Sequence, residues 1–192
     1  DEKFSEVLPE NEKKKFMESI SLNERDKVIL IFGGGDGIPH GKRILDELLK
    51  AQLNAKVIIV CGRNKQLYKY SLTLQIEYGI ENLIVFGYVD FVYELINSAH
   101  IVITKCGASS MMEILLQKKV PVVNDYIWEQ EKGNIEYLLK SNFGIYEPEI
   151  KKLPAVCKKL IEDGEFYSFY KRNIENAGLK NGTPEAANFI IQ

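Results

Sequence analysis

The sequence predicts an α/β fold: one doubly wound parallel sheet of about six strands, with helices on both faces. Two observations lead to this prediction. Short runs rich in valine and isoleucine recur without period-two alternation, and segments with helical spacing of apolar residues lie between them. Continuous apolar runs are typical of strands buried on both faces, and strand–helix alternation is typical of parallel sheets with right-handed crossovers. With 192 residues, 45% of them hydrophobic, the chain is long enough for one domain with its own core.

The strands are expected where the apolar runs are densest. These runs cover residues 27–33, 55–62, 82–87, 100–104 and 120–123, and a weaker sixth covers residues 144–146. Helices are expected where apolar residues recur at helical spacing, and a short charged helix is expected near residues 11–20. The helical stripes lie at residues 44–49, 114–115, 135–139 and 150–161, and Thr183-Pro184 predicts the start of a last helix to residue 192.

Composition excludes several classes of protein. Lys plus Arg total 25 and Asp plus Glu total 27, so nothing favours a nucleic-acid coat or a strongly basic membrane surface. No apolar run approaches the roughly 20 residues of a membrane-spanning helix. Three cysteines without a C-x-x-C pair predict buried, reduced thiols and a cytoplasmic protein, and two histidines are too few for a His/Cys metal site.

The chain divides into two unequal parts. Residues 1–24 are charged and are expected to form a helix or linker, whereas residues 25–192 form the doubly wound unit. Because the first residue is Asp1, the sequence is expected to be a piece of a longer protein. Ligands of such sheets bind beyond the carboxyl ends of the strands, so the loops at that edge are the places to look for chemistry.

A glycine-rich turn follows the first expected strand. Residues 33–41 contain five glycines, whose N–H groups can approach a phosphate closely at the start of the next helix. The dinucleotide fingerprint fails here, because His40 stands at its third glycine and no acidic residue ends the second strand. A P-loop fails too, because Arg43 follows Lys42 in place of Ser or Thr.

Two further loops at this edge carry polar side chains. In the first, Ser110 and Glu113 fit either a helix capping box or a site in which the carboxylate holds a ribose and short hydroxyls hold phosphate. In the second, residues 124–134 carry amide and carboxylate groups suited to sugar hydroxyls, although Glu129 and Glu131 also suit the dipole of a helix start. His100 is expected to be structural.

Taken together, these loops resemble a known family. Its pattern is the glycine turn followed by segments 59–65, 86–90, 103–107 with Glu113, and 121–127 with 130–134. Over roughly residues 26–192 the sequence is similar to the C-terminal, Rossmann-like donor half of GT-B glycosyltransferases. Within these it resembles family 28, which includes the monogalactosyldiacylglycerol synthases and the bacterial diacylglycerol glucosyltransferases. It departs from their Gly-Pro-Gly or Gly-Gly at 106–109 and from their small pair at 128–129, which leaves the identity of the sugar open.

The resemblance implies a set of donor-binding residues. Glu113 corresponds to the ribose-binding glutamate, Ser109 and Ser110 correspond to the phosphate-side hydroxyls, and the 86–89 turn corresponds to the uracil site. The full expected set is Gly34, Gly35, Gly37, Arg63, Phe86, Gly87, Tyr88, Val89, Gly107, Ser109, Ser110, Glu113, Gln130, Glu131 and Asn134.

The resemblance also implies a reaction. Such enzymes transfer a hexose from a UDP-sugar to a lipid hydroxyl with inversion, without an obligatory metal or other cofactor. The general base and the lipid site belong to an N-terminal domain, so this chain is expected to bind donor but to have little or no transfer activity. The full-length protein is expected at the cytoplasmic face of a membrane, with no nucleic-acid partner.

Three alternatives to the excised donor domain remain open from the sequence. The chain could be a stand-alone nucleotide-sugar-binding subunit that works with a separate acceptor-binding partner. It could be an NADP-binding oxidoreductase domain that uses Arg63 for the 2′-phosphate. It could also be a nucleotide-sugar epimerase of the same fold.

Overall fold

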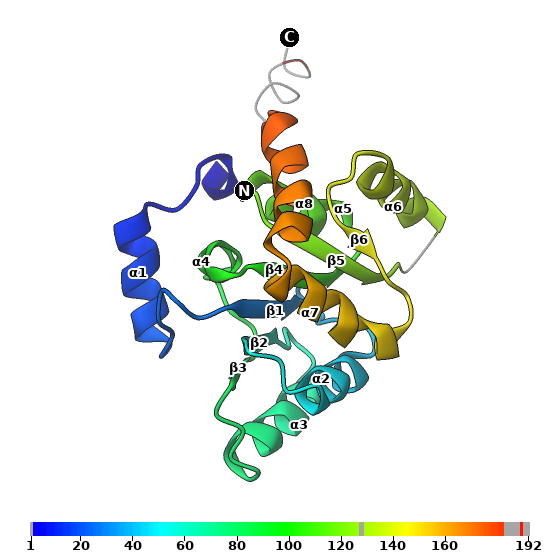
Figure 1. Cartoon of the computed structure of the whole chain (residues 1–192). Coiled ribbons are helices and arrows are strands. Elements are labelled where there is room, and N and C mark those ends of the chain that lie inside the picture. Colours follow the sequence, from blue (N-terminus) through cyan, green and yellow to red (C-terminus); the bar gives the residue numbers. More distant parts are fainter. Residues whose placement is uncertain (1, 127–128, 183–188, 190–192) are drawn as a thin grey trace.

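The computed structural model describes residues 2–126, 129–182 and 189 and contains one six-stranded parallel sheet (Figure 1). The strand order is β3-β2-β1-β4-β5-β6, and every neighbouring pair runs parallel. The strands are β1 (Val28–Phe32), β2 (Lys56–Val60), β3 (Leu83–Phe86), β4 (Ile101–Lys105), β5 (Val120–Asp125) and β6 (Ile145–Tyr146). Each expected strand, including the weak sixth, is therefore confirmed.

Helices α2 to α6 connect successive strands, as the alternation in the sequence predicts, and further helices precede β1 and follow β6. The helices are η1 (Glu2–Ser5), α1 (Glu10–Ser19), α2 (Gly41–Lys50), α3 (Lys65–Ile76), α4 (Val92–Ser98), α5 (Ala108–Leu116), α6 (Glu129–Lys140), η2 (Ile150–Lys152), α7 (Leu153–Glu162) and α8 (Gly164–Asn176). Helices α3, α4 and α8 do not correspond to any of the expected apolar stripes. Most of the helix expected over residues 183–192 lies outside the described residues.

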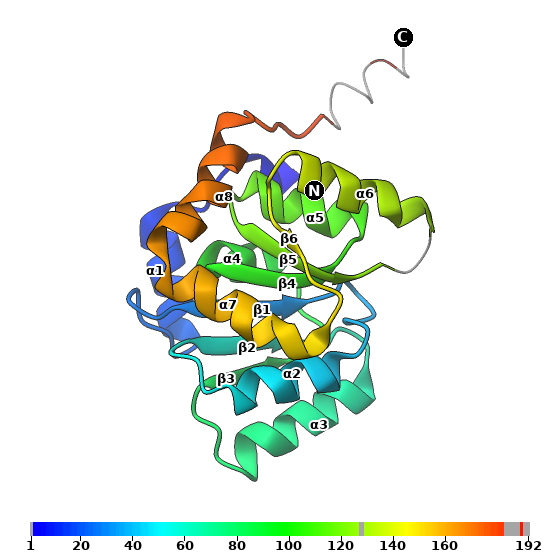
Figure 2. The ribbon, with the colours of Figure 1, turned by 45° about the vertical axis from the view of Figure 1, so that its right-hand side comes forward.

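Alternate residues of β1 face two different hydrophobic cores, because successive side chains of a strand point to opposite faces. Ile29 and Ile31 belong to the core beneath α2 and α7, which lie side by side in Figure 2. Leu30 belongs to the other core, which contains buried side chains of α1 and α4. Every residue of β1 is buried, so this strand forms the centre of the domain.

The N-terminal residues are part of the second core. Phe4, Leu8, Met17 and Leu22 are each at most 7% exposed, and α1 packs against α4. In Figure 1 this segment lies beside α4 and away from α2 and α3. Among the described residues no helix is long and apolar enough to span a membrane.

The three cysteines are buried and free, as predicted. Burial raises the pKa of Cys61 and of Cys106 to about 11 and that of Cys157 to about 12. Thiols with such pKa values stay protonated near neutral pH and are poor nucleophiles. The cysteines therefore contribute to packing and not to chemistry.

The strand order reverses between β1 and β4, which places the switch point of the sheet at the centre of the domain. The connections leave β1 and β4 in opposite directions, which opens a crevice at their carboxyl ends. The glycine turn that follows β1 and the start of α5, which follows β4, both lie at this point.

Acid is expected to destabilise the fold through His100, at the opposite edge of the sheet. Its Nδ1 accepts a hydrogen bond from the Val28 N–H at 3.2 Å. Burial, helped by Lys27 and Lys119, lowers its pKa from 6.5 to about 4. Between these pH values the unfolded chain binds a proton that the folded chain does not. The free energy of unfolding should therefore fall by about 2 kcal/mol as the pH drops from 6.5 to 4.

Urea unfolding of wild type and His100→Asn at several pH values measures this effect. The asparagine Oδ1 can accept the same hydrogen bond but does not titrate, so its pH profile should be flatter than that of wild type. His40→Asn is the control, because that side chain is 57% exposed. Equal profiles for wild type and His100→Asn would contradict the assignment to His100.

Candidate functional site

The glycine turn after β1 folds tightly back on itself, which explains its composition. A Cβ on Gly33 would lie 2.4 Å from the Ile38 Cα, closer than non-bonded carbon atoms approach each other. Gly34 and Gly37 have φ values of 83° and 81°, a region that side chains disfavour. The turn thus needs glycine for its own geometry, and it brings the backbone of Gly34 and Gly35 to the crevice.

The loop after β2 packs directly on this turn, backbone against backbone. Gly62 has a φ of 57°, and a Cβ there would lie 2.4 Å from the carbonyl oxygen of Gly35. The Arg63 N–H donates a hydrogen bond to the same carbonyl at 2.8 Å. The Arg63 guanidinium lies over the ring of Tyr88, 5.1 Å from its centroid. Arg63 therefore connects the glycine turn to the turn that follows β3.

Residues of that third turn have different roles. The ring of Phe86 packs edge-on against Phe91, with centroids 5.4 Å apart, and the Gly87 carbonyl accepts a hydrogen bond from the Gly62 N–H at 3.2 Å. Tyr88 and Val89 line a cavity, and Tyr88 is 63% exposed. The turn thus offers Tyr88 and Val89 to a ligand, whereas Phe86 belongs to the core.

The capping-box interpretation of Ser110 and Glu113 is wrong. Helix α5 begins three residues earlier than a capping box requires, with Gly107 as N-cap, and no side chain caps it. Ser110 is therefore already inside the first turn, and Glu113 follows on the next turn. Ser110 and Glu113 do not cap the helix. Together with Ser109 they line the same cavity as Tyr88.

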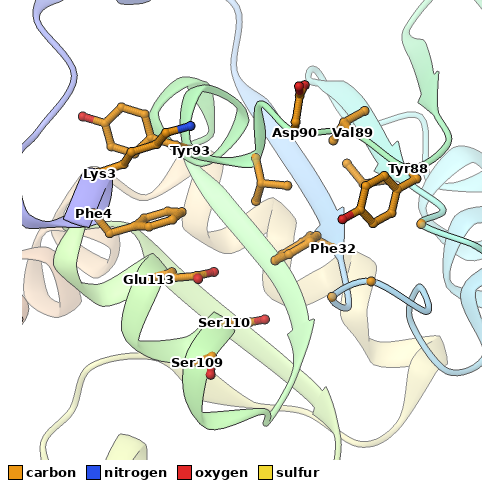
Figure 3. A pocket seen from close by; sticks show the side chains of 15 residues that line it. Lys3, Phe4, Phe32, Tyr88, Val89, Asp90, Tyr93, Ser109, Ser110 and Glu113 are labelled. Atoms are coloured by element: carbon orange, nitrogen blue, oxygen red, sulfur yellow. The ribbon is translucent and has the colours of Figure 1, made fainter. Parts of the chain in front are cut away.

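This cavity has a volume of about 310 Å³ and lies at the switch point (Figure 3). Glu113, Ser110 and Ser109 come from α5, and Gly34 and Gly35 come from the glycine turn. Figure 3 shows Phe32 between Glu113 and Tyr88. Burial raises the pKa of the Glu113 carboxyl above its usual value. Its hydrogen bonds to a ligand would therefore be shielded from competing water.

A second cavity of about 550 Å³ adjoins the first and shares Gly34, Gly35, Ser109 and Ser110 with it. The rest of the glycine turn lines one part of it, and Lys105 and Glu131 line another. The Lys105 Nζ lies 3.7 Å from a Glu131 carboxylate oxygen, and both side chains are mostly buried. Loop amides, two hydroxyls and the Lys105 ammonium line this space and suit an anion such as phosphate, although the carboxylates of Asp36 and Glu131 line it too.

Of the three site residues expected on α6, only one lines either cavity. Glu131 lines the second cavity, but Gln130 is exposed and lines neither cavity. The Asn134 Nδ2 donates a hydrogen bond to the Cys106 carbonyl at 3.0 Å and so holds α6 against the end of β4. Trp128 lies outside the described residues.

Sequence reasoning missed several residues of the site. Lys105 was overlooked although it ends β4 directly beside the glycine turn, a position that could have been inferred from the strand alone. Asp90 and Tyr93 also line the first cavity, and so do Lys3 and Phe4 from the N-terminal segment. No pattern in the sequence places residues 3 and 4 near residue 113.

Comparison with known proteins agrees with this geometry. The model of the glycosyltransferase family 28 C-terminal domain matches residues 28–177. A probable monogalactosyldiacylglycerol synthase of Nicotiana tabacum is 28% identical over 157 residues, which are 78% of this chain and 29% of that protein. The processive diacylglycerol beta-glucosyltransferase of Bacillus subtilis is 28% identical over 170 residues, or 85% of this chain and 42% of the enzyme. The chain thus spans less than half of these relatives.

Solved structures show the same fold. WaaG, a glycosyltransferase of lipopolysaccharide biosynthesis, superposes with a TM-score of 0.72 at 20% identity over 100% of this chain and 54% of that chain. HepE of Anabaena, in complex with UDP and glucose, superposes with a TM-score of 0.70 at 15% identity over 92% of this chain and 49% of that chain. The family match over residues 28–177 and the parallel sheet lead to the same result, which confirms the resemblance seen in the sequence. The chain belongs to the glycosyltransferase family 28 C-terminal domain family.

Proposed function

We propose that residues 25–192 form the donor-binding domain of an inverting hexosyltransferase, which takes a UDP-hexose and passes the hexose to a lipid hydroxyl. The observation that carries this proposal is one cavity that combines the Glu113 carboxylate with the two serines of α5 and the backbone of Gly34 and Gly35. A carboxylate can accept two hydrogen bonds from vicinal ribose hydroxyls, while short hydroxyls and N–H groups suit a diphosphate.

The two cavities divide the donor between them. We assign the nucleoside to the first cavity, with the base near Tyr88 and Val89 and the ribose on Glu113. The diphosphate then lies over Gly34, Gly35 and the start of α5, which both cavities share. Glu131, with Gln130 on the same helix, is assigned to the hexose. In this arrangement Gly37 and Gly107 shape the loops, and Asn134 holds α6 in position.

Charge explains how this site would assist transfer. When the anomeric C–O bond breaks, an oxocarbenium-like sugar forms and the departing UDP gains negative charge. The N-terminus of α5 and the Lys105 ammonium lie beside the proposed diphosphate position, so they stabilise that charge. We propose that these groups serve in place of a metal ion or other cofactor.

The acceptor side of the reaction is assigned to another domain. The lipid hydroxyl must lose a proton on the face of the sugar opposite to UDP. The curated relatives are more than twice as long as the segment they share with this chain. We propose that the general base, the lipid site and any membrane contact at the cytoplasmic face lie in the part of the relatives outside this segment. Two of these relatives are named for diacylglycerol or its galactolipid, which supports a diacylglycerol-type acceptor.

Calorimetric titration of this chain with UDP tests the proposal. We expect saturable UDP binding and none with ADP or NADPH. The proposed site holds a uracil nucleotide, so ADP tests selection of the base, and the glycine turn lacks the dinucleotide fingerprint that NADPH would need. UDP-glucose and UDP-galactose are then compared in the same cell to identify the sugar. Binding of NADPH without UDP would contradict the donor-domain assignment and favour an oxidoreductase.

A further inference from the structure

Residues 3–8, called the N-terminal strap here, begin at the first cavity, which Lys3 and Phe4 line. Phe4 is 6% exposed and packs edge-on against Tyr93, with ring centroids 5.4 Å apart. The Tyr93 hydroxyl donates a hydrogen bond to the Glu6 carbonyl at 2.9 Å. Leu8, at the other end of the strap, is 7% exposed. The strap is therefore fixed to the domain at several points.

Two buried amide side chains bind the backbone of the strap. The Gln117 Nε2 donates to the Phe4 carbonyl at 2.9 Å, and the Asn97 Oδ1 accepts from the Leu8 N–H at 3.3 Å. The two amides also bond to each other, since the Asn97 Nδ2 donates to the Gln117 Oε1 at 3.0 Å. Each is 1% exposed. Displacing the strap would remove the Phe4 carbonyl from the Gln117 Nε2 and the Leu8 N–H from the Asn97 Oδ1. Losing these two bonds at buried atoms makes displacement costly.

The strap is held at the end of the helix that carries the proposed ribose-binding carboxylate. Gln117 is the C-cap residue of α5, and its N–H donates a hydrogen bond to the Glu113 carbonyl, four residues earlier, at 3.3 Å. Figure 3 shows Phe4 beside Glu113, with Lys3 and Tyr93 next to it and Tyr88 on the far side of the cavity. Glu113 is thus flanked by Phe4 on one side and by Ser110 on the other.

We propose that the N-terminal strap is a wall of the nucleoside site and that Phe4 is a positioning residue for the ribose. This inference rests on the proposed function. Phe4 covers one side of Glu113, excludes water there and limits the positions that the carboxylate can take. Hydrogen bonds from Glu113 to ribose hydroxyls are stronger and better directed under these conditions.

The test compares Phe4→Ala with Phe16→Ala. Phe16 is a matched control because it also comes from the N-terminal segment and packs on an aromatic ring, that of Phe91 at 5.7 Å. It is not among the described residues that line either cavity. Calorimetry measures the affinity of both variants for UDP, uridine and pyrophosphate, and urea unfolding measures their stability. Gln117→Leu, which keeps the volume but removes the bond to the strap, is a second test should Phe4→Ala not fold.

We expect Phe4→Ala to weaken the binding of UDP and of uridine by the same factor, about five- to tenfold. Pyrophosphate should be unaffected, Phe4→Leu should restore most of the affinity, and Phe16→Ala should lower stability alone. Gln117→Leu should change affinity in the same direction as Phe4→Ala. If wild type binds UDP and Phe4→Ala binds it equally well, or if Phe16→Ala weakens it as much, the role of the strap is wrong while the donor site stands. If wild type binds no UDP, both proposals are wrong.

Discussion

Glu113→Ala is expected to weaken UDP binding about 100-fold, because two hydrogen bonds from ribose hydroxyls to a carboxylate are lost. The carboxylate is half-buried, its pKa is raised by burial, and no capping role competes for it. The partial burial makes those bonds worth more than they would be at the surface. Calorimetry with UDP measures the loss directly.

Three controls make this result specific. Glu113→Gln keeps one acceptor oxygen and should weaken UDP about tenfold, between wild type and alanine. Pyrophosphate lacks a ribose, so its binding should be the same in all three proteins. Glu136→Ala, which removes an exposed glutamate of α6, should leave UDP binding unchanged. UDP binding that survives Glu113→Ala would show that the ribose lies elsewhere.

The strands of this fold could be predicted because burial on both faces is visible in the sequence. All residues of β1 are buried, and the apolar run at residues 27–33 shows it. Helices were harder to predict where their exposed faces carry aromatic residues. Helix α8, for example, has Phe169 at 44% exposure and buries only Ile174, so its apolar residues form no clear stripe.

The residues of the site also differ in how well the sequence predicts them. Glu113 could be identified because its motif is local, and the glycine turn because its composition is unusual. The capping box was a local pattern too, but α5 begins after Gly107 and not after Ser110, so the pattern does not describe this helix start. Phe4 reaches the site through contacts with residues more than 80 positions away, and such contacts leave no periodic signal.

Gly62→Ala is expected to damage both stability and the site, because two independent constraints require glycine there. Its φ of 57° costs a non-glycine residue roughly 1 kcal/mol or more, and a Cβ would lie 2.4 Å from the Gly35 carbonyl oxygen. That oxygen is backbone and accepts the Arg63 N–H, so it cannot move without shifting the glycine turn. We expect a loss of about 4 kcal/mol in the free energy of unfolding, measured in urea.

Gly79→Ala separates the two constraints. Gly79 has a similar φ of 63°, but a Cβ there would meet nothing within 4 Å. It should therefore lose only about 1 kcal/mol of stability and keep full UDP affinity. Gly62→Ala should lose more than tenfold in UDP affinity wherever it remains folded, because displacement of Gly35 moves the proposed phosphate-binding backbone. If both variants lost the same stability and both bound UDP as wild type does, close packing of the two loops would not be what holds the glycine turn in place. The phosphate geometry would then depend on the turn alone.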